Sequence, residues 1–356
     1  MQFWRGTMGA LAALMALAIM QPAQATQLLP MPALDAAVER NDYRRIEAVV
    51  VERGGVIQFE RYYGDTTAQT RIDARSAGKS ITALAVGIAI DEGALSGVDA
   101  RVFDILADRA PFENDGDLKR AITVRDFLTM SSALDCNDWD PSPGNEENMY
   151  ERSDWTRFAV DIPIAADYAR NENGFGRYSY CTAGAFLLGR VLERATNTPF
   201  DEYVQSRIFT PLGIEDAIWR RSPTGEVQSG GQLSLRARDF TAIGRMILNR
   251  GVDGDGDRIV SREWLNEMFQ PVQRATPQDT YGYLWWIRNF RTANRTYVGF
   301  YMSGNGGNKI VILPEIDTVV VILSTFYNQR TMHQQTTDII EQYVLPALEA
   351  AEAARQ

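Results

Sequence analysis

One stretch of sequence decides the fold: Arg75-Ser76-Ala77-Gly78-Lys79-Ser80, followed by the apolar run from Ile81 to Ile90. Apolar residues recur in that run at positions 81, 84, 85, 88 and 89, which is helical spacing, and the other positions are small. The spacing predicts a helix that is buried on nearly all sides, with Ser76 and Lys79 in its first turn. Because residues three apart share one face of a helix, a hydroxyl and an amine lie within contact range there. A serine nucleophile and its base require this geometry.

The position of Lys79 at a helix N-terminus also matters. Free N–H groups and the positive end of the helix dipole stabilise a developing oxyanion and disfavour an ammonium, so we expect a neutral amine. The chain contains only three lysines, which makes a chance Ser-x-x-Lys match uncommon. The alternative is a serine N-cap followed by a solvated lysine, but the helix is so apolar that it has no evident solvent-exposed face for that lysine.

Length and charge limit the class of protein. The chain has 356 residues, of which 45% are hydrophobic, enough for one large or two small domains with a sizeable core. The formal net charge is −10 and the isoelectric point is near 4.9. These values argue against nucleic acid or an anionic membrane as a partner. The oligomeric state is not indicated by any pattern.

The N-terminus has the pattern of an export signal. Arg5 is followed by an apolar run over residues 8–20, and Ala23-Gln24-Ala25 fits a cleavage site. We expect residues 1–25 to be removed and the mature chain to start at Thr26. A membrane anchor needs about 20 apolar residues, which is longer than this run, so no anchor is expected in the mature chain. For a bacterial protein, the expected location is periplasmic or secreted.

The cysteines and one acidic run raise the question of cross-links and metals. Cys136 and Cys181 are the only cysteines, and export to an oxidising compartment favours one disulfide over two buried free thiols. The run 253–257 imitates the start of a calcium loop, but Arg258 and Trp264 occupy the positions that need glycine and glutamate. We interpret the run as a solvated turn and expect neither a metal nor a cofactor.

Strand patterns occur at both ends of the chain and helical patterns between them. The segments are a helix over 31–43, a hairpin of strands 46–51 and 56–63, helices over 123–130 (capped by Thr123), 180–195 and 234–250 (capped by Ser234), strands 309–313 and 318–323, and a last helix over 331–352. This order predicts an α/β fold of the α+β type, in which residues 26–92 and 250–356 build an antiparallel sheet with flanking helices. Residues 93–249 form a mostly helical region inserted into it, and the whole is one domain.

Two further segments complete the candidate site. Tyr180 and Thr182 precede an apolar helix, and tyrosine can act where a histidine is missing. The single histidine, His333, is far from Ser76 in the sequence, so a Ser-His-Asp triad is not expected. The other segment is Ser303-Gly304-Asn305-Gly306-Gly307-Asn308-Lys309, whose glycines allow a backbone to approach a ligand. An ordinary glycine turn in a hairpin is the alternative for that segment.

Taken together and in this order, the three segments resemble the serine beta-lactamase and penicillin-binding-protein superfamily, in particular its class C beta-lactamase-like branch of esterases and 6-aminohexanoate-dimer hydrolases. The resemblance covers nearly the whole mature chain. Supporting stretches are Met130-Ser131-Ser132, Pro211-Leu212-Gly213-Ile214, Gly230-Gly231-Gln232-Leu233-Ser234-Leu235 and Tyr281-Gly282-Tyr283-Leu284-Trp285-Trp286. The last of these is interpreted either as a pocket lining or as core.

The resemblance implies roles for individual residues. Ser76 would be the nucleophile, Lys79 its base, and Tyr180 the proton relay to the leaving group, with Tyr178 as the alternative tyrosine. The N–H groups of Ser76 and Gly307 would bind the oxyanion. Thr182, Asn305, Gly306 and Gly307 would contact the substrate.

Two departures from the family pattern bear on the substrate. Thr182 stands where the family commonly has asparagine, and Gly304-Asn305-Gly306 lacks the cation that opens the third motif; Lys309, five residues on, is not assigned that role. The loss of a cationic anchor and of an amide argues against efficient penicillin turnover and favours small esters or uncharged amides. The expected function is therefore hydrolysis of a small ester or amide through an acyl-enzyme on Ser76. The alternatives are a D-alanyl-D-alanine peptidase or weak beta-lactamase, and a non-catalytic protein that binds a cell-wall or peptide ligand.

Overall fold

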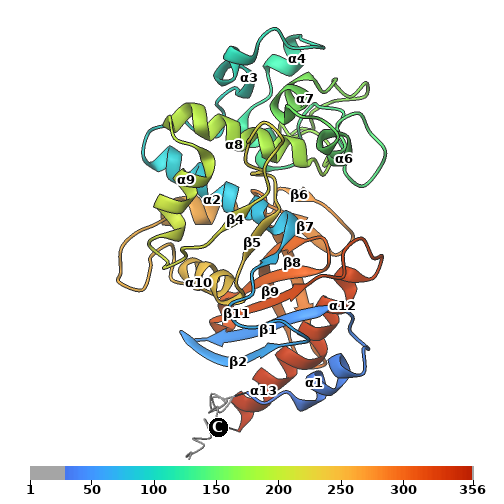
Figure 1. The fold of residues 1–356 in the computed structure, drawn as a ribbon, viewed down its shortest axis with the longest axis vertical. Helices are drawn as coiled ribbons and strands as arrows, with labels where there is room; N and C mark the ends of the chain where they lie inside the picture. Colours follow the sequence, from blue (N-terminus) through green and yellow to red (C-terminus); the bar gives the residue numbers. More distant parts are fainter. Residues whose placement is uncertain (1–28, 355–356) are drawn as a thin grey trace, which may run out of the picture.

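The computed structural model describes residues 29–354. The predicted signal peptide, residues 1–25, lies outside them. The described chain has two parts (Figure 1): a large sheet with helices packed on it, and a mostly helical region built from the middle of the sequence. Among the residues that the structure describes, no helix is both long and apolar enough to cross a membrane.

The large sheet is antiparallel and draws its strands from both ends of the chain. Its order is β2-β1-β11-β10-β9-β8-β7-β6. The strands are β1 (Ile46–Arg53), β2 (Val56–Tyr62), β6 (Gln273–Arg274), β7 (Asp279–Tyr281), β8 (Trp286–Arg291), β9 (Thr296–Gly304), β10 (Asn308–Leu313) and β11 (Thr318–Ser324). β10 and β11 are buried throughout because both faces of the sheet are covered, which explains their continuous apolar sequences. The predicted fold class, hairpin and C-terminal strands are confirmed.

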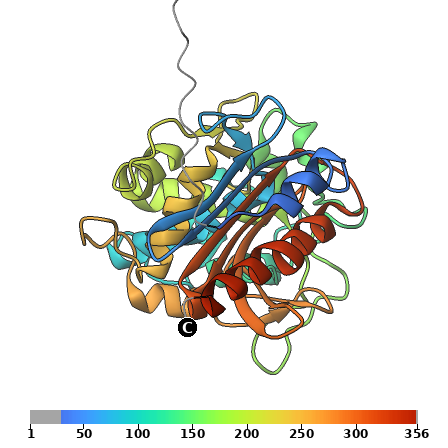
Figure 2. The ribbon, with the colours of Figure 1, turned by 90° about the horizontal axis from the view of Figure 1, so that it is seen from below.

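Terminal helices cover the face of the sheet that points away from the helical region (Figure 2). They are α1 (Pro32–Glu39), α12 (Met332–Ile339), a π-helical turn η5 (Ile340–Val344) and α13 (Leu345–Ala353). A single helix was predicted over 331–352. The π turn interrupts it just before Pro346, which has no N–H to continue the α-helical hydrogen bonds.

On the opposite face, α10 (Ala237–Leu248) packs against β1, β10 and β11. It belongs to the segment 93–249, so that segment also supplies a covering helix to the sheet. The prediction that Ser234 caps this helix is wrong: Ser234 lies in β5 (Leu233–Leu235), and Arg236 caps α10 together with Asp239. A serine before an apolar helix fits a cap or a short strand equally well in sequence alone.

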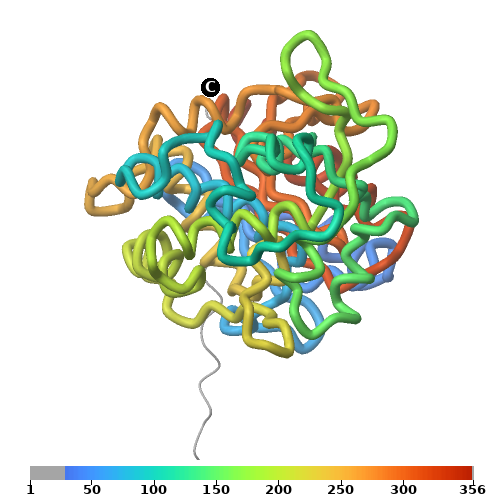
Figure 3. Tube along the Cα trace, turned by 90° about the horizontal axis from the view of Figure 1, so that it is seen from above, coloured from blue at the N-terminus to red at the C-terminus, as the bar shows by residue number. Residues whose placement is uncertain are grey.

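The inserted region sits above the sheet and is built around α8 (Figure 3). Its helices are α3 (Val102–Ile105), η2 (Ala107–Arg109), α4 (Asp117–Arg120), α5 (Val124–Leu128), α6 (Glu146–Tyr150), α7 (Trp155–Asp161), α8 (Thr182–Thr196), α9 (Phe200–Val204) and the π turn η3 (Gln205–Phe209). A small sheet of β3 (Ile72–Asp73), β5 and β4 (Ile218–Trp219) lies between the two parts. α11 (Arg262–Met268) packs through Trp264 against the helix α2 (Gly78–Asp91). Thr123 caps α5 through a capping box with Asp126, as predicted.

Candidate active site

Ser76 lies in a short 3₁₀ turn, η1 (Arg75–Ala77), that leads directly into α2 (Gly78–Asp91). Lys79 Nζ donates a hydrogen bond to Ser76 Oγ at 2.9 Å. The predicted burial of this helix is confirmed, since every residue from Gly78 to Ala89 is buried. Gly87 is required by packing: a Cβ there would lie 2.2 Å from the indole of Trp264.

Lys79 is almost completely buried, with 1% of its surface exposed, whereas Ser76 is partly exposed. Within residues 29–354, no carboxylate comes within 4.0 Å of Lys79 Nζ. The amine lies 4.9 Å from the ring centroid of Tyr180. A buried lysine whose hydrogen-bond partner is a serine hydroxyl is arranged to exchange a proton with that hydroxyl.

Tyr180 joins Ser76 and Lys79 in a group of three polar side chains. Burial raises the pKa of the Tyr180 phenol, while the charge of Lys79 and a hydrogen bond with Ser76 act in the opposite direction. The phenol therefore stays protonated at neutral pH and can donate a proton. Tyr178 lies two residues earlier in the chain, and its buried hydroxyl has no hydrogen-bond partner in the described structure. The structure thus places Tyr180, and not Tyr178, beside the serine and the lysine.

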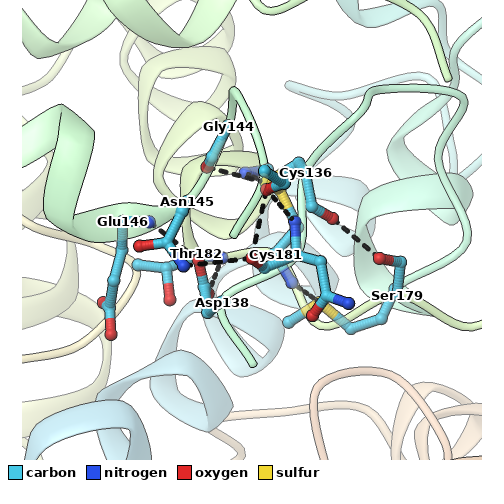
Figure 4. Close-up of a disulfide and its surroundings, with 12 residues drawn as sticks. Cys136, Asp138, Gly144, Asn145, Glu146, Ser179, Cys181 and Thr182 are labelled. Atoms are coloured by element: carbon cyan, nitrogen blue, oxygen red, sulfur yellow. Dashed lines mark hydrogen bonds between the residues drawn. A yellow bond between two sulfur atoms is a disulfide. The ribbon is translucent and has the colours of Figure 1, made fainter. Parts of the chain in front are cut away.

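A disulfide fixes the loop that faces these residues. Cys136 and Cys181 are bonded, with their Cα atoms 5.4 Å apart, which confirms the predicted bridge (Figure 4). Cys181 stands between Tyr180 and Thr182, so the bridge ties the loop 135–145, which precedes α6, to the N-terminus of α8. The Asp138 N–H donates to Tyr180 O at 2.8 Å, and Asp138 Oδ2 accepts from Thr182 N at 2.7 Å.

Asp138 is a site residue that the sequence did not reveal. Burial raises its pKa to about 6, the negative charge of Glu146 adds to this effect, and Lys79 and a hydrogen bond from Thr182 oppose it. Its other oxygen accepts from Glu146 N at 2.9 Å. Asp138 and Glu146 both line the cavity that opens on Ser76. Asp138 sits in an irregular loop and Glu146 begins the short helix α6, so no periodicity in the sequence points to either residue.

Thr182 plays a different part from the one expected. It is buried, its N–H holds Asp138, and its Oγ1 has no partner in the described structure. The cavity that opens on Ser76 is lined by Asp138 and Tyr180 rather than by Thr182. The structure therefore supports Thr182 as a holder of Asp138, and it does not place this side chain against a substrate.

The glycine-rich segment forms the turn between β9 and β10, and the expected roles of two of its glycines need correction. The Gly307 N–H donates to Gly304 O at 3.1 Å, and the Gly306 N–H to Met332 Sδ at 3.1 Å. Both N–H groups are thus engaged in the turn, with φ of 90° and 91°, and neither residue lines the cavity. The prediction that Gly307 binds the oxyanion and that Gly306 contacts the substrate is therefore wrong.

Gly304 and Asn305, rather than Gly306 and Gly307, line the cavity beside Ser76. Gly304 ends β9 against η1, where a Cβ would lie 1.8 Å from Ala74 O. Ser303, Gly304 and Asn305 line the cavity together with Ser76. The close approach of β9 to η1 puts the backbone of Gly304 next to the turn that carries Ser76.

The cavity itself measures about 680 Å³. Trp139 stacks on Tyr180 with centroids 5.4 Å apart, and Trp286 lies 5.9 Å from Tyr180, so one wall is aromatic. Of the aromatic run 281–286, Trp286 lines the cavity, whereas Tyr281 and Trp285 are core. The remaining lining comes from the sheet, from the loop before β7, and from α12 together with the loop that precedes it. These residues are Thr276, Gln278, Asp279, Arg288, Tyr301, Lys309, Asn328, Gln329, Arg330, Met332, His333, Gln334 and Thr337.

His333 reaches the same cavity from α12, although it is far from Ser76 in sequence. Ser76 Oγ is nevertheless hydrogen-bonded by Lys79 and not by this histidine. In the part of the chain that the structure describes, no group of acidic, histidine or cysteine side chains is arranged to hold a metal ion. The run 253–257 is a turn in which Asp253 accepts from the N–H groups of Asp255 and Asp257.

Comparisons with known proteins assign the family. The Beta-lactamase family model matches residues 34–343. The chain belongs to this family. It is 27% identical over 332 residues to 6-aminohexanoate-dimer hydrolase of Paenarthrobacter ureafaciens, covering 87% of this chain and 82% of that one. It is 26% identical over 245 residues, 61% of each protein, to Penicillin-binding protein 4 of Amycolatopsis lactamdurans.

Solved structures agree on the fold. The D-stereospecific amidohydrolase of a Streptomyces species superposes with a TM-score of 0.65 at 18% identity, over 87% of this chain and 98% of that one. The penicillin-binding protein of Bacillus halodurans superposes with a TM-score of 0.62 at 17% identity, over 89% and 98%. The predicted superfamily and fold are confirmed, and the chain is a hydrolase of the beta-lactamase fold.

Proposed function

We propose that this protein is an exported serine hydrolase that cleaves a small ester or amide through an acyl-enzyme on Ser76. The observation that carries the proposal is the 2.9 Å hydrogen bond between Lys79 Nζ and Ser76 Oγ at the wall of an open cavity, with Tyr180 beside them. The hydrolase relative that matches 87% of the chain supports the reaction class.

The chemistry follows from the positions of these groups. Lys79 takes the proton of Ser76 Oγ as the oxygen attacks the carbonyl carbon, and the carbonyl oxygen becomes an oxyanion. The N–H groups of Ser76 and Asn305 are the candidates to bind it, since both residues line the cavity where β9 meets η1. Tyr180 gives a proton to the leaving group, and water then cleaves the acyl-enzyme by the same route in reverse.

Hydrolysis of p-nitrophenyl acetate tests the proposal. We expect turnover by the wild type and its loss in Ser76→Ala. Ser80→Ala is the matched control, because Ser80 lies four residues further on, in α2, and donates to Leu284 O at 2.7 Å, away from the cavity. Turnover that persists in Ser76→Ala would refute the assignment of the nucleophile.

Export is proposed from the signal pattern at residues 1–25, and the disulfide supports it, because structural disulfides persist in oxidising compartments. The mass of the protein recovered from a bacterial periplasm or medium tests it. A mature chain that begins at Thr26 would agree, and an uncleaved cytoplasmic chain would contradict it.

A peptidase or weak beta-lactamase is the second candidate, favoured by the similarity to Penicillin-binding protein 4. Incubation with benzylpenicillin, followed by intact mass measurement, separates the two. A stable penicilloyl adduct on Ser76 would favour this candidate, and rapid ester turnover without an adduct would favour the first.

A further inference from the structure

A second cavity adjoins the one that opens on Ser76. It measures about 610 Å³, and Trp139 lines both cavities. The centroid of the Trp139 ring lies 5.4 Å from that of Tyr180, which lines the catalytic cavity. It lies 5.8 Å from that of Tyr178, which lines the second cavity. The two cavities therefore meet at this indole.

Trp139 is held in place at the junction although 53% of its surface is exposed. It follows Asp138, whose N–H donates to Tyr180 O, and it lies three residues after the disulfide-bonded Cys136. The planes of the Trp139 and Tyr180 rings are 10° apart, so the two rings are stacked. An exposed ring that is already fixed offers a stacking surface to a ligand at a low cost in conformational entropy.

Apolar side chains line much of the second cavity. Ala169, Phe175 and Ala275 lie in its lining together with the rings of Trp139 and Tyr178. The chain also passes directly from one cavity to the other, because Ala275 lines the second and the next residue, Thr276, lines the catalytic one. A ligand that extends from the catalytic cavity could bury an aromatic body here.

Two arginines at the second cavity have no acidic partner. Arg177 and Arg274 both line it and are exposed, and no carboxylate of the described residues comes within 4.0 Å of either guanidinium group. Arg274 donates to a neutral acceptor, Pro277 O, at 3.1 Å. Both guanidinium groups can therefore still bind an anion.

The other charged groups nearby do not change this balance. Arg170 also lines the second cavity, but Asp126 binds it with two bonds of 2.7 and 2.8 Å. Asp167 and Glu172 belong to the same segment of the chain, yet neither lines the cavity, whose lining contains no carboxylate. The charge that this lining presents is therefore positive, in a chain whose net charge is −10.

A surface hollow without a role is the alternative, and another hollow of the described chain provides the comparison. That hollow measures about 440 Å³ and is lined by Arg152 and Arg157, but also by the carboxylates of Glu113, Asp154 and Asp161. It shares no lining residue with the catalytic cavity. The second cavity differs from it in both respects.

The position of Trp139 indicates which part of a substrate would reach the second cavity. In the proposed reaction Tyr180 gives its proton to the leaving group, so the leaving group lies at Tyr180 when the bond breaks. Trp139 is stacked on Tyr180 and forms the boundary with the second cavity. A long leaving group would therefore continue across this indole.

We propose that the second cavity is a subsite for the leaving group of the substrate, and that it takes an elongated leaving group with an aromatic body and an anionic end. The body stacks on Trp139 and packs beside Phe175, and Arg177 and Arg274 bind the anionic end. This proposal rests on the proposed function and narrows its substrate class.

The test compares acetate esters that differ only in the leaving group. Phenyl acetate is the short ester, biphenyl-4-yl acetate adds an aromatic body, and its derivative with a sulfonate at the far end of the biphenyl adds the anion. The sulfonate is one ring away from the ester, so the two biphenyl esters should react with hydroxide at similar rates, which is measured as a reference. We expect the wild type to show about a fivefold higher kcat/KM for the sulfonated ester than for the neutral biphenyl ester, the effect of exposed ion pairs.

Variants assign that preference to the second cavity. The double variant Arg177→Gln with Arg274→Gln should remove it and leave the turnover of phenyl acetate unchanged. Arg152→Gln is the matched control, because Arg152 is an exposed arginine at the unrelated hollow, and it should keep the preference. Trp139→Ala should lower kcat/KM about tenfold more for the biphenyl esters than for phenyl acetate, because the stacking surface is lost.

The outcomes separate the two proposals. Lack of turnover of all three esters refutes the proposed function itself. Turnover of phenyl acetate with no preference for the sulfonated leaving group overturns only the subsite, and this result needs no variant. A preference that survives in the double arginine variant also overturns the subsite, because another cation would then bind the sulfonate. Both arginines are exposed, so the double variant should fold, and circular dichroism checks this.

A second pair of esters tests the assignment to the leaving group. The phenyl ester of biphenyl-4-ylacetic acid and its sulfonated derivative carry the same body and anion on the acyl group. We expect no preference within this pair that depends on Arg177 and Arg274. A preference that depends on these arginines in the acyl pair, and not in the leaving-group pair, would overturn the assignment.

Discussion

Replacing Gly304 by alanine should separate β9 from the nucleophile's turn. A Cβ at this position would lie 1.8 Å from Ala74 O, 2.9 Å from Ala74 C and 3.2 Å from Ala77 N. An ordinary contact needs about 3.4 Å, so the two backbones must move apart by about 1.6 Å. Both sides of this contact are backbone, so no side chain can rotate away.

The magnitude follows from that displacement. Overpacking of this kind costs about 1–3 kcal/mol of unfolding free energy. A displacement of about 1 Å at reacting groups lowers kcat about 100-fold, so we expect at least that loss for Gly304→Ala. Ser76 lies between Ala74 and Ala77, the two residues that the new methyl group would push.

Urea unfolding and the turnover of p-nitrophenyl acetate measure both effects. Gly254→Ala is the matched control, because a Cβ there meets no atom within 4 Å. Wild-type turnover and stability in Gly304→Ala would show that β9 does not press on η1. A loss of stability without a loss of turnover would refute the claim that this contact positions Ser76.

Four further predictions follow from the site. Lys79→Met should lower kcat/KM about 10²–10⁴-fold because the base is lost, and Tyr180→Phe should lower kcat/KM because the proton donor is lost. Circular dichroism should show that both variants are folded. An unaltered kcat/KM in either variant would contradict the role of the residue replaced. Cys136→Ser should lower the unfolding free energy by about 4 kcal/mol, the loop-entropy value for a bridge spanning 45 residues, and an unaltered urea midpoint would contradict this. The raised pKa of Asp138, about 6, means that the folded protein binds this proton more tightly than the unfolded chain. As the pH rises from about 4 to 6, the unfolding free energy should therefore fall by up to about 3 kcal/mol, and Asp138→Asn should flatten that fall. An identical pH profile for the variant would refute the raised pKa of Asp138.

The sequence revealed the elements that depend on local periodicity. The helix after Ser76, the hairpin of β1 and β2 and the buried strands β10 and β11 all follow from the spacing of apolar residues. The pairing of the two cysteines needed no geometry, because the chain offers one possible bridge. The juxtaposition of Ser76 and Lys79 is likewise a consequence of helical spacing.

The rest of the site depends on contacts between distant segments. Asp138 is placed by the disulfide and by hydrogen bonds to α8, and a loop of this kind has no period that a sequence pattern could detect. Glycines of a tight turn and glycines beside a ligand look alike in sequence, which is why Gly306 and Gly307 were assigned wrongly and Gly304 was not singled out. Lys309 reaches the cavity only through the cross-strand register.

The most direct test of the central claim is the intact mass of the mature protein after incubation with a fluorophosphonate, for the wild type and Ser76→Ala. We predict one adduct on the wild type and none on the variant, because Lys79 activates this serine alone. An adduct on both proteins, or on neither while a small ester is still turned over, would contradict the account of Ser76 as the activated nucleophile.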